Sequence, residues 1–149
     1  MKQIEIHLTQ KTEIDAVHAI FAENLPEVWS KEALFDEIDY PYSLLISAVV
    51  DGQVAGFLDA RFVFGDGELL NIAVDPEFRR FGVGNALLTE MVNRAKTEKL
   101  TAITLEVRSQ NLGARRFYES FGFEEIGIRK RFYESPEDDA VLYQLQLED

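Results

Sequence analysis

The sequence predicts a mixed α/β domain with a central, mostly antiparallel sheet that is flanked by helices. Some segments of strand length alternate apolar with polar residues, whereas others repeat apolar residues at helical spacing. Asp51-Gly52 separates two apolar runs, which is a strong signal for an antiparallel hairpin. With 149 residues, 46% of them hydrophobic, the chain can form one core, so we expect a single domain over residues 1–149.

The N-terminal third predicts one strand and two helices. Residues 4–8 alternate apolar and polar side chains as a strand does. Residues 14–21 carry apolar side chains at helical spacing, and Ser30 stands in the position of an N-cap for a short helix that reaches Ile38.

The middle of the chain predicts an antiparallel meander. Residues 43–50 and 53–64 are the two apolar runs of the hairpin. Gly65-Asp66-Gly67 is typical of a second turn, after which residues 69–74 form another strand that Asp75-Pro76 ends.

The C-terminal half alternates helices with strands. Apolar side chains recur at helical spacing from Val83 to about Lys99. A shorter helix follows at residues 112–121, and Gly122 ends it. The remaining apolar segments predict strands, over residues 101–107, 123–129 and 140–147.

Composition excludes several kinds of chemistry. The chain has no cysteine, which rules out disulfides, thiolate metal sites and a cysteine nucleophile. His7 and His18 have no accompanying ligand cluster, so we expect no metal. The net charge of −12 opposes binding to nucleic acid and favours basic partners, or it serves solubility alone. The N-terminus lacks the regions of a signal peptide and no apolar stretch has membrane length, so we expect a cytoplasmic protein without membrane contact.

The segment 79–85 joins a predicted strand to a predicted helix and suits an anion. Backbone N–H groups at a helix N-terminus point toward any anion placed there, and pyrophosphate is a natural ligand. Gly82 and Gly84 permit close backbone approach, while Arg79 and Arg80 add positive charge. The same residues are also compatible with a tight turn and solvated arginines. Neither common nucleotide-binding pattern is present, which disfavours dinucleotides and ATP.

The spacing Arg79-x-x-Gly82-x-Gly84 resembles the [QR]-x-x-G-x-[GA] acetyl-CoA loop of the GCN5-related N-acetyltransferase (GNAT) superfamily. Residues 71–76, 105–108 and 117–123 are similar to the bacterial ribosomal-protein-alanine N-acetyltransferase group within it, and the resemblance is dense from about Leu69 to Tyr133. It implies a GNAT-like acyl-CoA N-acyltransferase fold, in which the sheet splays beside the loop to admit the pantetheine arm.

The resemblance also implies acetyl-CoA as co-substrate and assigns residues to it. Backbone groups of one strand would pair with the pantetheine arm, a loop would hold the pyrophosphate, and Asn111 would lie near the thiol. Many members of the group have arginine where this chain has Asn85, so one phosphate-facing charge is missing here, although the backbone site remains. The strand residues are Ile72, Ala73 and Val74, and the loop residues are Arg79, Arg80, Phe81, Gly82, Val83, Gly84 and Asn85.

Glu106 is the candidate base. Ile103, Leu105 and Val107 share one face of their strand, which places Glu106 on the other face, where it is available to a cleft. Alternation alone is equally typical of a solvated glutamate on a sheet. The resemblance makes Glu106 the general base, acting through a water molecule.

Tyr118 is the candidate acid. Its helix position beside Phe117 and Phe121 is also typical of an aromatic residue at the edge of a core. The resemblance places its hydroxyl beside the departing sulfur, where it would protonate the thiolate. Because the chain has no cysteine, we expect direct attack by the amine in a ternary complex.

The acceptor is the least determined part of the prediction. Trp29 and Tyr133 resemble acceptor-side residues of the group, although Val28 replaces the usual proline, and both are equally compatible with packing roles. The favoured acceptor is the N-terminal α-amine of a basic, ribosomal protein. The alternatives are a small amine, a polyamine or a lysine side chain, and a non-catalytic acyl-CoA-binding module, against which the presence of Glu106, Asn111 and Tyr118 weighs.

Overall fold

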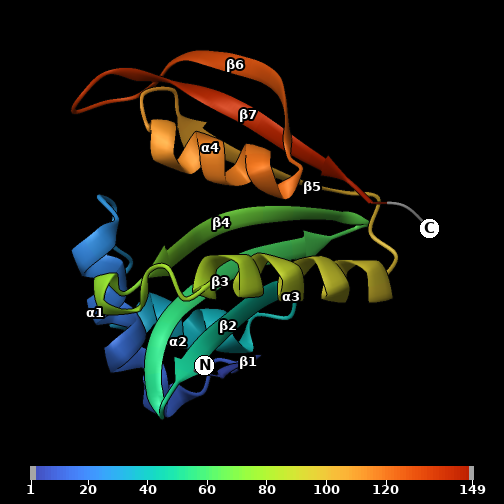
Figure 1. Ribbon diagram of the computed structural model, residues 1–149. Coiled ribbons are helices and arrows are strands. Elements are labelled where there is room, and N and C mark those ends of the chain that lie inside the picture. Colours follow the sequence, from blue (N-terminus) through green and yellow to red (C-terminus); the bar gives the residue numbers. More distant parts are fainter. Residues whose placement is uncertain (1–2, 148–149) are drawn as a thin grey trace.

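The computed structural model describes residues 3–147, and Figure 1 shows its helices and strands. The predicted mixed α/β architecture, with a mostly antiparallel sheet flanked by helices, is confirmed. The strands are β1 Ile4–Leu8, β2 Ser43–Val50, β3 Gln53–Val63, β4 Asp66–Val74, β5 Ala102–Arg108, β6 Glu124–Tyr133 and β7 Asp138–Gln146. The α-helices are α1 Ile14–Asn24, α2 Lys31–Asp39, α3 Val83–Thr97 and α4 Leu112–Phe121, and short 3-10 turns cover Lys11–Glu13 and Pro76–Phe78.

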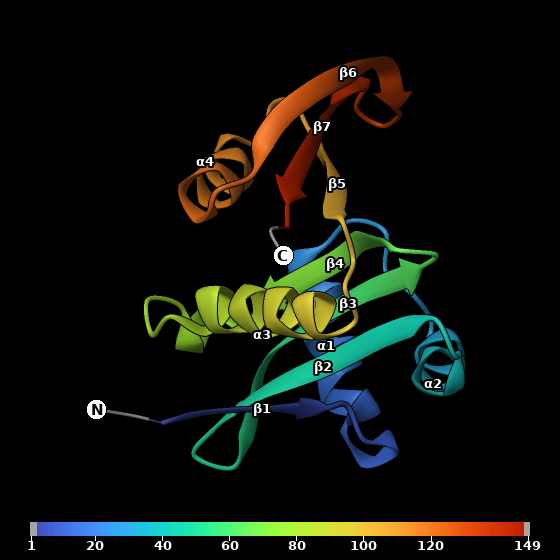
Figure 2. The same cartoon turned by 90° about the vertical axis from the view of Figure 1, so that its right-hand side faces the viewer.

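The strands form one sheet in the order β1-β2-β3-β4-β5-β7-β6. Neighbouring strands are antiparallel except for β4 and β5, which are parallel and pair only from Asp66–Glu68 to Ala102–Thr104. Beyond this contact the two strands diverge, so that β1 to β4 form one part of the sheet and β5 to β7 another (Figures 1 and 2). This divergence is the splay that the family resemblance implied.

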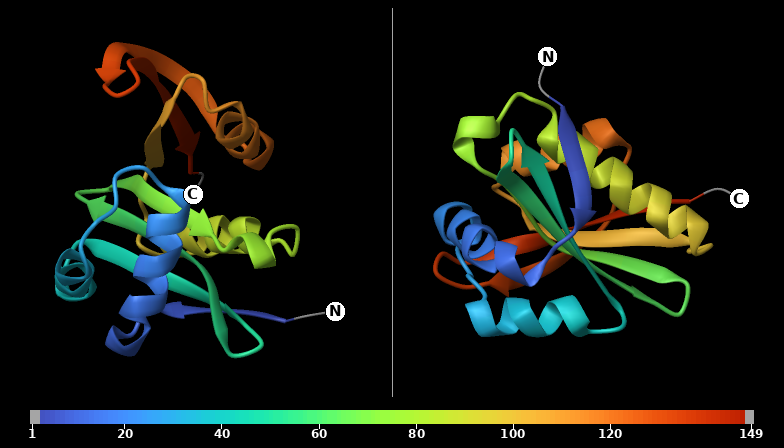
Figure 3. Two further views of the ribbon diagram at one scale, coloured as in Figure 1. Left: turned by 90° about the vertical axis from the view of Figure 1, so that its left-hand side faces the viewer. Right: turned by 90° about the horizontal axis from the view of Figure 1, so that it is seen from below.

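Helices cover both faces of the β1–β4 part of the sheet. Figure 3 shows α1 and α2 on one side of β2 and β3 and α3 on the other. Val17 and Phe21 of α1 and Leu34 of α2 are buried in one apolar cluster, whereas Leu87 and Met91 of α3 are buried in a second. Each set follows the helical spacing that the sequence shows. Within residues 3–147, no helix is both long enough and apolar enough to cross a membrane.

Two strands are longer than the sequence predicted. The turn before β4 needs only Phe64 and Gly65, so β4 begins at Asp66, and its first three residues are the ones that pair with β5. β6 continues to Tyr133 because it pairs with β7 as far as Asp138. For β4, the pairing with β5 involves a segment far along the chain, and no local signal in the sequence marks it. β6 instead pairs with the next strand, and its added residues, 130–133, are mostly exposed and lack the apolar alternation of a half-buried strand.

Candidate active site

A cavity of about 990 Å³ lies where β4 and β5 diverge. Its walls come from the end of α1, from β4 and β5, from the loop that precedes α3, and from α4. Phe81 and Trp29 are not among the residues that line it. The predicted site residues that it brings together are Ile72, Ala73, Val74, Arg79, Arg80, Gly82, Val83, Gly84, Asn85, Glu106, Asn111, Tyr118 and Tyr133.

The divergence leaves one edge of β4 open to the cavity. Ile72 to Val74 pair with β3 on one side, but in the described part of the chain β5 pairs with nothing in β4 beyond Glu68. Leu70 has no partner in β3, which marks a bulge where the strands part. Unpaired backbone N–H and C=O groups are strong hydrogen-bonding groups, so this edge suits a ligand that carries amides.

The loop before α3 presents a helix N-terminus to the cavity. Gly82 is the N-cap with a φ of 83°, a left-handed conformation that glycine adopts without strain. Arg80 also has a positive φ, of 73°. The first intrahelical bond runs from the N–H of Ala86 to the carbonyl of Gly82, so the N–H groups before it remain available to an anion.

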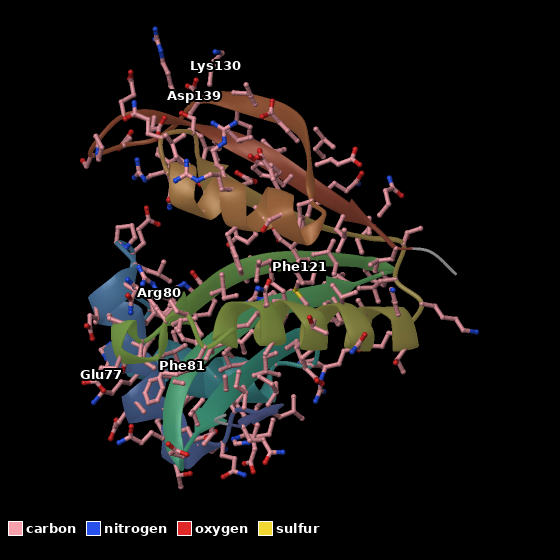
Figure 4. The ribbon with its side chains drawn as sticks, viewed as in Figure 1. Glu77, Arg80, Phe81, Phe121, Lys130 and Asp139 are labelled. Carbon is pink, nitrogen blue, oxygen red and sulfur yellow. The ribbon has the colours of Figure 1, made fainter. Side chains whose placement is uncertain are left out.

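The two glycines of the loop serve different purposes. A Cβ at Gly82 would meet no atom within 4 Å, so its positive φ is the reason for glycine there. A Cβ at Gly84 would lie 3.0 Å from the ring tip of Phe117, so Gly84 permits α4 to approach. Arg79 donates a hydrogen bond to the Asn24 side chain, whereas Arg80, which lies beside Phe81 in the loop before α3 (Figure 4), lines the cavity.

Gly84→Leu is therefore expected to weaken acetyl-CoA binding about tenfold or more, because leucine would push Phe117 aside and cover the N–H groups. Gly84→Ala, whose extra methyl meets only the end of one ring, serves as the graded control and should lose much less. Calorimetric titration with acetyl-CoA measures both variants. An unchanged affinity in Gly84→Leu contradicts the assignment of the loop.

Glu106 projects from β5 into the cavity, while Ile103, Leu105 and Val107 are buried on the other face, as alternation predicted. Its Oε1 lies 3.8 Å from a guanidinium nitrogen of Arg129 in β6. Its Oε2 is buried and has no hydrogen-bond partner among the described residues. A buried carboxylate oxygen without a partner is placed to accept a proton from water or from an amine.

Tyr118 faces the same cavity from α4 and is 8% exposed. Its ring packs edge-on against Phe123 at a centroid distance of 5.8 Å, which holds the side chain in place. Burial, and then the proximity of Tyr133, raise the pKa of Tyr118 above its usual value because they disfavour the phenolate. The hydroxyl therefore keeps its proton at neutral pH and is a hydrogen-bond donor.

Asn111 and Tyr133 also line this cavity. Asn111 is the N-cap of α4, where its side-chain oxygen accepts a hydrogen bond from the N–H of Ala114 at 3.2 Å. Tyr133 lies under the guanidinium of Arg108, 4.4 Å from its ring centre. Burial, and then the charge of Glu106, raise the pKa of Tyr133. Tyr133 is thus close to Glu106.

Trp29 lies apart from these residues. It contacts Phe21, at 6.4 Å between ring centres, and lines a separate depression of about 470 Å³ beside α2. Ser30, its neighbour, is the N-cap of α2 as predicted, and accepts a hydrogen bond from the N–H of Ala33 at 3.0 Å. The segment that reaches the main cavity is instead the end of α1 and the following residues, Asn24, Leu25 and Pro26.

A partly buried polar network lies beside the cavity and was not predicted from the sequence. Asp59 in β3 is fully buried, and Glu37 in α2 is 3% exposed. Arg61 donates two hydrogen bonds to Glu37, at 2.8 and 3.2 Å, and Asn71 donates one to Asp59 at 3.4 Å. In the sequence, this network is indicated by a single aspartate, Asp59, inside the apolar run of residues 53–64. Burial, and then the hydrogen bond and charge of Glu37, raise the pKa of Asp59 to about 9.

Asp59 is expected to make stability fall as pH rises. Between its ordinary value near 3.8 and about 9, the folded protein keeps a proton that the unfolded chain has lost. Stability from this group is therefore greatest below the unfolded pKa and decreases up to the folded pKa. The wild-type protein should therefore lose on the order of a few kcal/mol of its free energy of unfolding over that range, and Asp59→Asn should not show this loss. Urea unfolding of both proteins from pH 5 to 9 measures the difference between their free energies of unfolding. A difference that does not change with pH contradicts the prediction.

Comparisons with known proteins identify the family of this chain. The model of the acetyltransferase (GNAT) family matches residues 14–123. The [ribosomal protein bS18]-alanine N-acetyltransferase of Salmonella typhimurium is 34% identical over 121 residues, which cover 80% of this chain and 81% of the relative. The same-named protein of Haemophilus ducreyi is also 34% identical, over 80% of this chain and 83% of its own.

Among solved structures, the ribosomal-protein-S18-alanine N-acetyltransferase of Escherichia coli superimposes with a TM-score of 0.89. It is 28% identical to this chain, and the match covers 99% of this chain and 96% of that one. Within the residues that the structure describes, no group of three or more His, Cys, Asp or Glu side chains is placed to hold a metal ion.

Proposed function

Since the chain belongs to the acetyltransferase (GNAT) family and is an acetyl-CoA-dependent N-acetyltransferase, we propose that its acceptor is the N-terminal α-amine of a protein. One observation carries the proposal: a single cavity is lined by the loop before α3, Glu106 and Tyr118, and also by Tyr133 and the end of α1. The relatives named for acetylating a ribosomal protein at alanine support the same acceptor.

The residues present fit acetyl-CoA. We propose that the N–H groups at the start of α3, with Arg80, hold its pyrophosphate, and that the open edge of Ile72 to Val74 pairs with the amides of the pantetheine arm. We also propose that Asn111, the N-cap of α4, lies near the thiol end. Acetyl-CoA supplies a thioester, from which an amine can take the acetyl group directly.

Glu106 and Tyr118 divide the proton transfers between them. The amine nitrogen forms a bond to the acetyl carbon as the bond from that carbon to sulfur breaks. Glu106, through a water molecule, takes the proton that the nitrogen loses. Tyr118, which burial keeps protonated, gives a proton to the departing sulfur. The absence of cysteine leaves no nucleophile for an acyl-cysteine intermediate, so the transfer is a single displacement.

An α-amine suits this arrangement better than a lysine. The amine must be neutral to attack, and the reference pKa of an α-amine is near ~8, against ~10.4 for lysine. A base of ordinary strength is then sufficient. The net charge of −12 favours encounter with a basic polypeptide, and a ribosomal protein is such a partner. We place the reaction in the cytoplasm, where ribosomal proteins are made.

A peptide with a free N-terminal alanine and a basic sequence is expected to be acetylated at that amine. The same peptide with a blocked N-terminus and one free internal lysine is expected to remain unmodified, because the cavity must place a backbone end beside the thioester. Mass spectrometry of both peptides after incubation with acetyl-CoA checks this. Preferential acetylation of lysine, or of a polyamine added in parallel, would assign the acceptor to another class of amine.

A further inference from the structure

The buried network of Asp59, Glu37, Arg61 and Asn71 has no part in the proton transfers described above. Asp59 and Asn71 are direct partners across β3 and β4, and their side chains lie on the sheet face that α1 and α2 cover. Only one member of the network, Asn71, is among the residues that line the cavity. Asp59 is completely buried behind it.

Glu37 is held in place at the far end of the network. Arg61 holds it with two hydrogen bonds, and the guanidinium of Arg61 lies 4.6 Å above the ring of Tyr40. Two parallel hydrogen bonds between a guanidinium and a carboxylate fix the relative orientation of the two groups, although both side chains are long and flexible. Glu37 thus presents its carboxylate oxygens as hydrogen-bond acceptors in a defined place.

The protonation of Asp59 explains an otherwise orphaned atom. As a carboxylate, Asp59 would leave its buried Oδ1 without a hydrogen-bond partner among residues 3–147. With a proton, it can donate to Glu37, and its Oδ2 still accepts from the amide nitrogen of Asn71. The Asn71 amide is then oriented: its NH₂ group faces Asp59, and its carbonyl oxygen is left for another partner.

We propose that Asn71 binds the acceptor, with its side-chain carbonyl accepting a hydrogen bond from the amine or from the first backbone N–H, and that Asp59 is a positioning residue for Asn71. The inference rests on the proposed function, because it requires a peptide acceptor on the side of the cavity that faces α1. Pro26, which follows α1, and Tyr133, at the end of β6, both line the cavity, and α3 lies on the opposite face of the sheet from α1 (Figure 3).

Asn71→Ala tests the contact with the acceptor. It removes the amide from a half-buried cavity position, so the protein should fold. The acceptor KM is expected to rise roughly two- to tenfold, the effect of one hydrogen bond, while acetyl-CoA affinity stays at the wild-type value. An acceptor KM that does not change overturns the proposal.

Two substitutions of Asp59 test its positioning role. Asp59→Asn supplies an NH₂ group that can donate to Glu37 and a carbonyl that can accept from Asn71, so the acceptor KM should stay near the wild-type value. Asp59→Leu supplies neither and should raise the acceptor KM as much as Asn71→Ala, with no further rise in the double variant. Equal behaviour of Asp59→Asn and Asp59→Leu overturns the proposal.

A pH series keeps the test valid if Asp59→Leu does not fold. Both proteins act on the same amine, so its titration cancels when the wild-type acceptor KM is divided by that of Asp59→Asn. That ratio should rise above pH about 9, where Asp59 of the wild type ionises beside Glu37; a flat ratio contradicts the inference. If the wild-type protein acetylates no peptide N-terminus, the proposed acceptor is wrong. If it does acetylate the peptide but Asn71→Ala leaves the acceptor KM unchanged, only the role of Asn71 is wrong.

Discussion

Replacing Tyr118 by phenylalanine is expected to lower turnover about 100-fold, with folding and acetyl-CoA binding unchanged. The ring remains packed against Phe123, so only the hydroxyl is lost. Without it, the departing sulfur must leave as a thiolate or take its proton from water. General acids contribute roughly 10²–10⁴-fold, and partial replacement by water places the expected loss at the lower end.

Single-turnover kinetics with the peptide acceptor measure this loss directly, and calorimetry verifies that acetyl-CoA still binds. Tyr42→Phe is a matched control, since it deletes a phenol hydroxyl from an exposed residue outside the cavity and should not alter turnover. If Tyr118→Phe turns over at the wild-type rate, Tyr118 is a packing residue of α4 and another group protonates the sulfur.

Glu106→Gln is expected to lower turnover by about 100-fold or more at neutral pH, because glutamine keeps the shape of the side chain but accepts no proton. The deficit should shrink as pH rises through the pKa of the acceptor amine, near ~8, since an amine that is already neutral needs no base. This pH dependence separates a base from a residue that merely orients the acceptor.

The measurement is the ratio of wild-type to variant turnover from pH 6 to 10 at saturating acetyl-CoA. Glu124→Gln, at an exposed position on β6, removes one carboxylate from the same part of the sheet and should leave the ratio near one throughout. A deficit in Glu106→Gln that stays constant over the whole range would show that Glu106 positions the acceptor instead.

Local chemistry made much of the fold predictable from the sequence. The Asp51-Gly52 hairpin, the Ser30 cap and the end of α4 at Gly122 each depend on residues next to one another, and the structure confirms all three. The start of β4 depends on pairing with β5, a segment far along the chain, and no nearby residue indicates that pairing. β6 pairs with the next strand, but its last residues are mostly exposed and lack the apolar alternation that marks a half-buried strand.

The candidate site, too, was predictable where neighbouring residues determine it and unpredictable where packing between distant elements does. Alternation along β5 was enough to predict which face carries Glu106, and the loop spacing was enough to find the helix N-terminus. The separation of Trp29 from the cavity depends on how α2 packs. The burial of Asp59 depends on Glu37 from that same helix, so a lone aspartate in a strand could not be distinguished from a solvated one.

The divergence of β4 from β5 places an unpaired strand edge in the middle of a sheet. At the rim of a sheet, such an edge invites pairing with strands of other molecules and promotes aggregation. Here the edge of Ile72 to Val74 lies inside a cavity whose walls include Phe117 and the loop at Gly82. A slender ligand with amide groups can reach it, whereas a strand from another chain would first have to displace α4. The same walls that admit the cofactor arm therefore protect the protein from association through its own open edge.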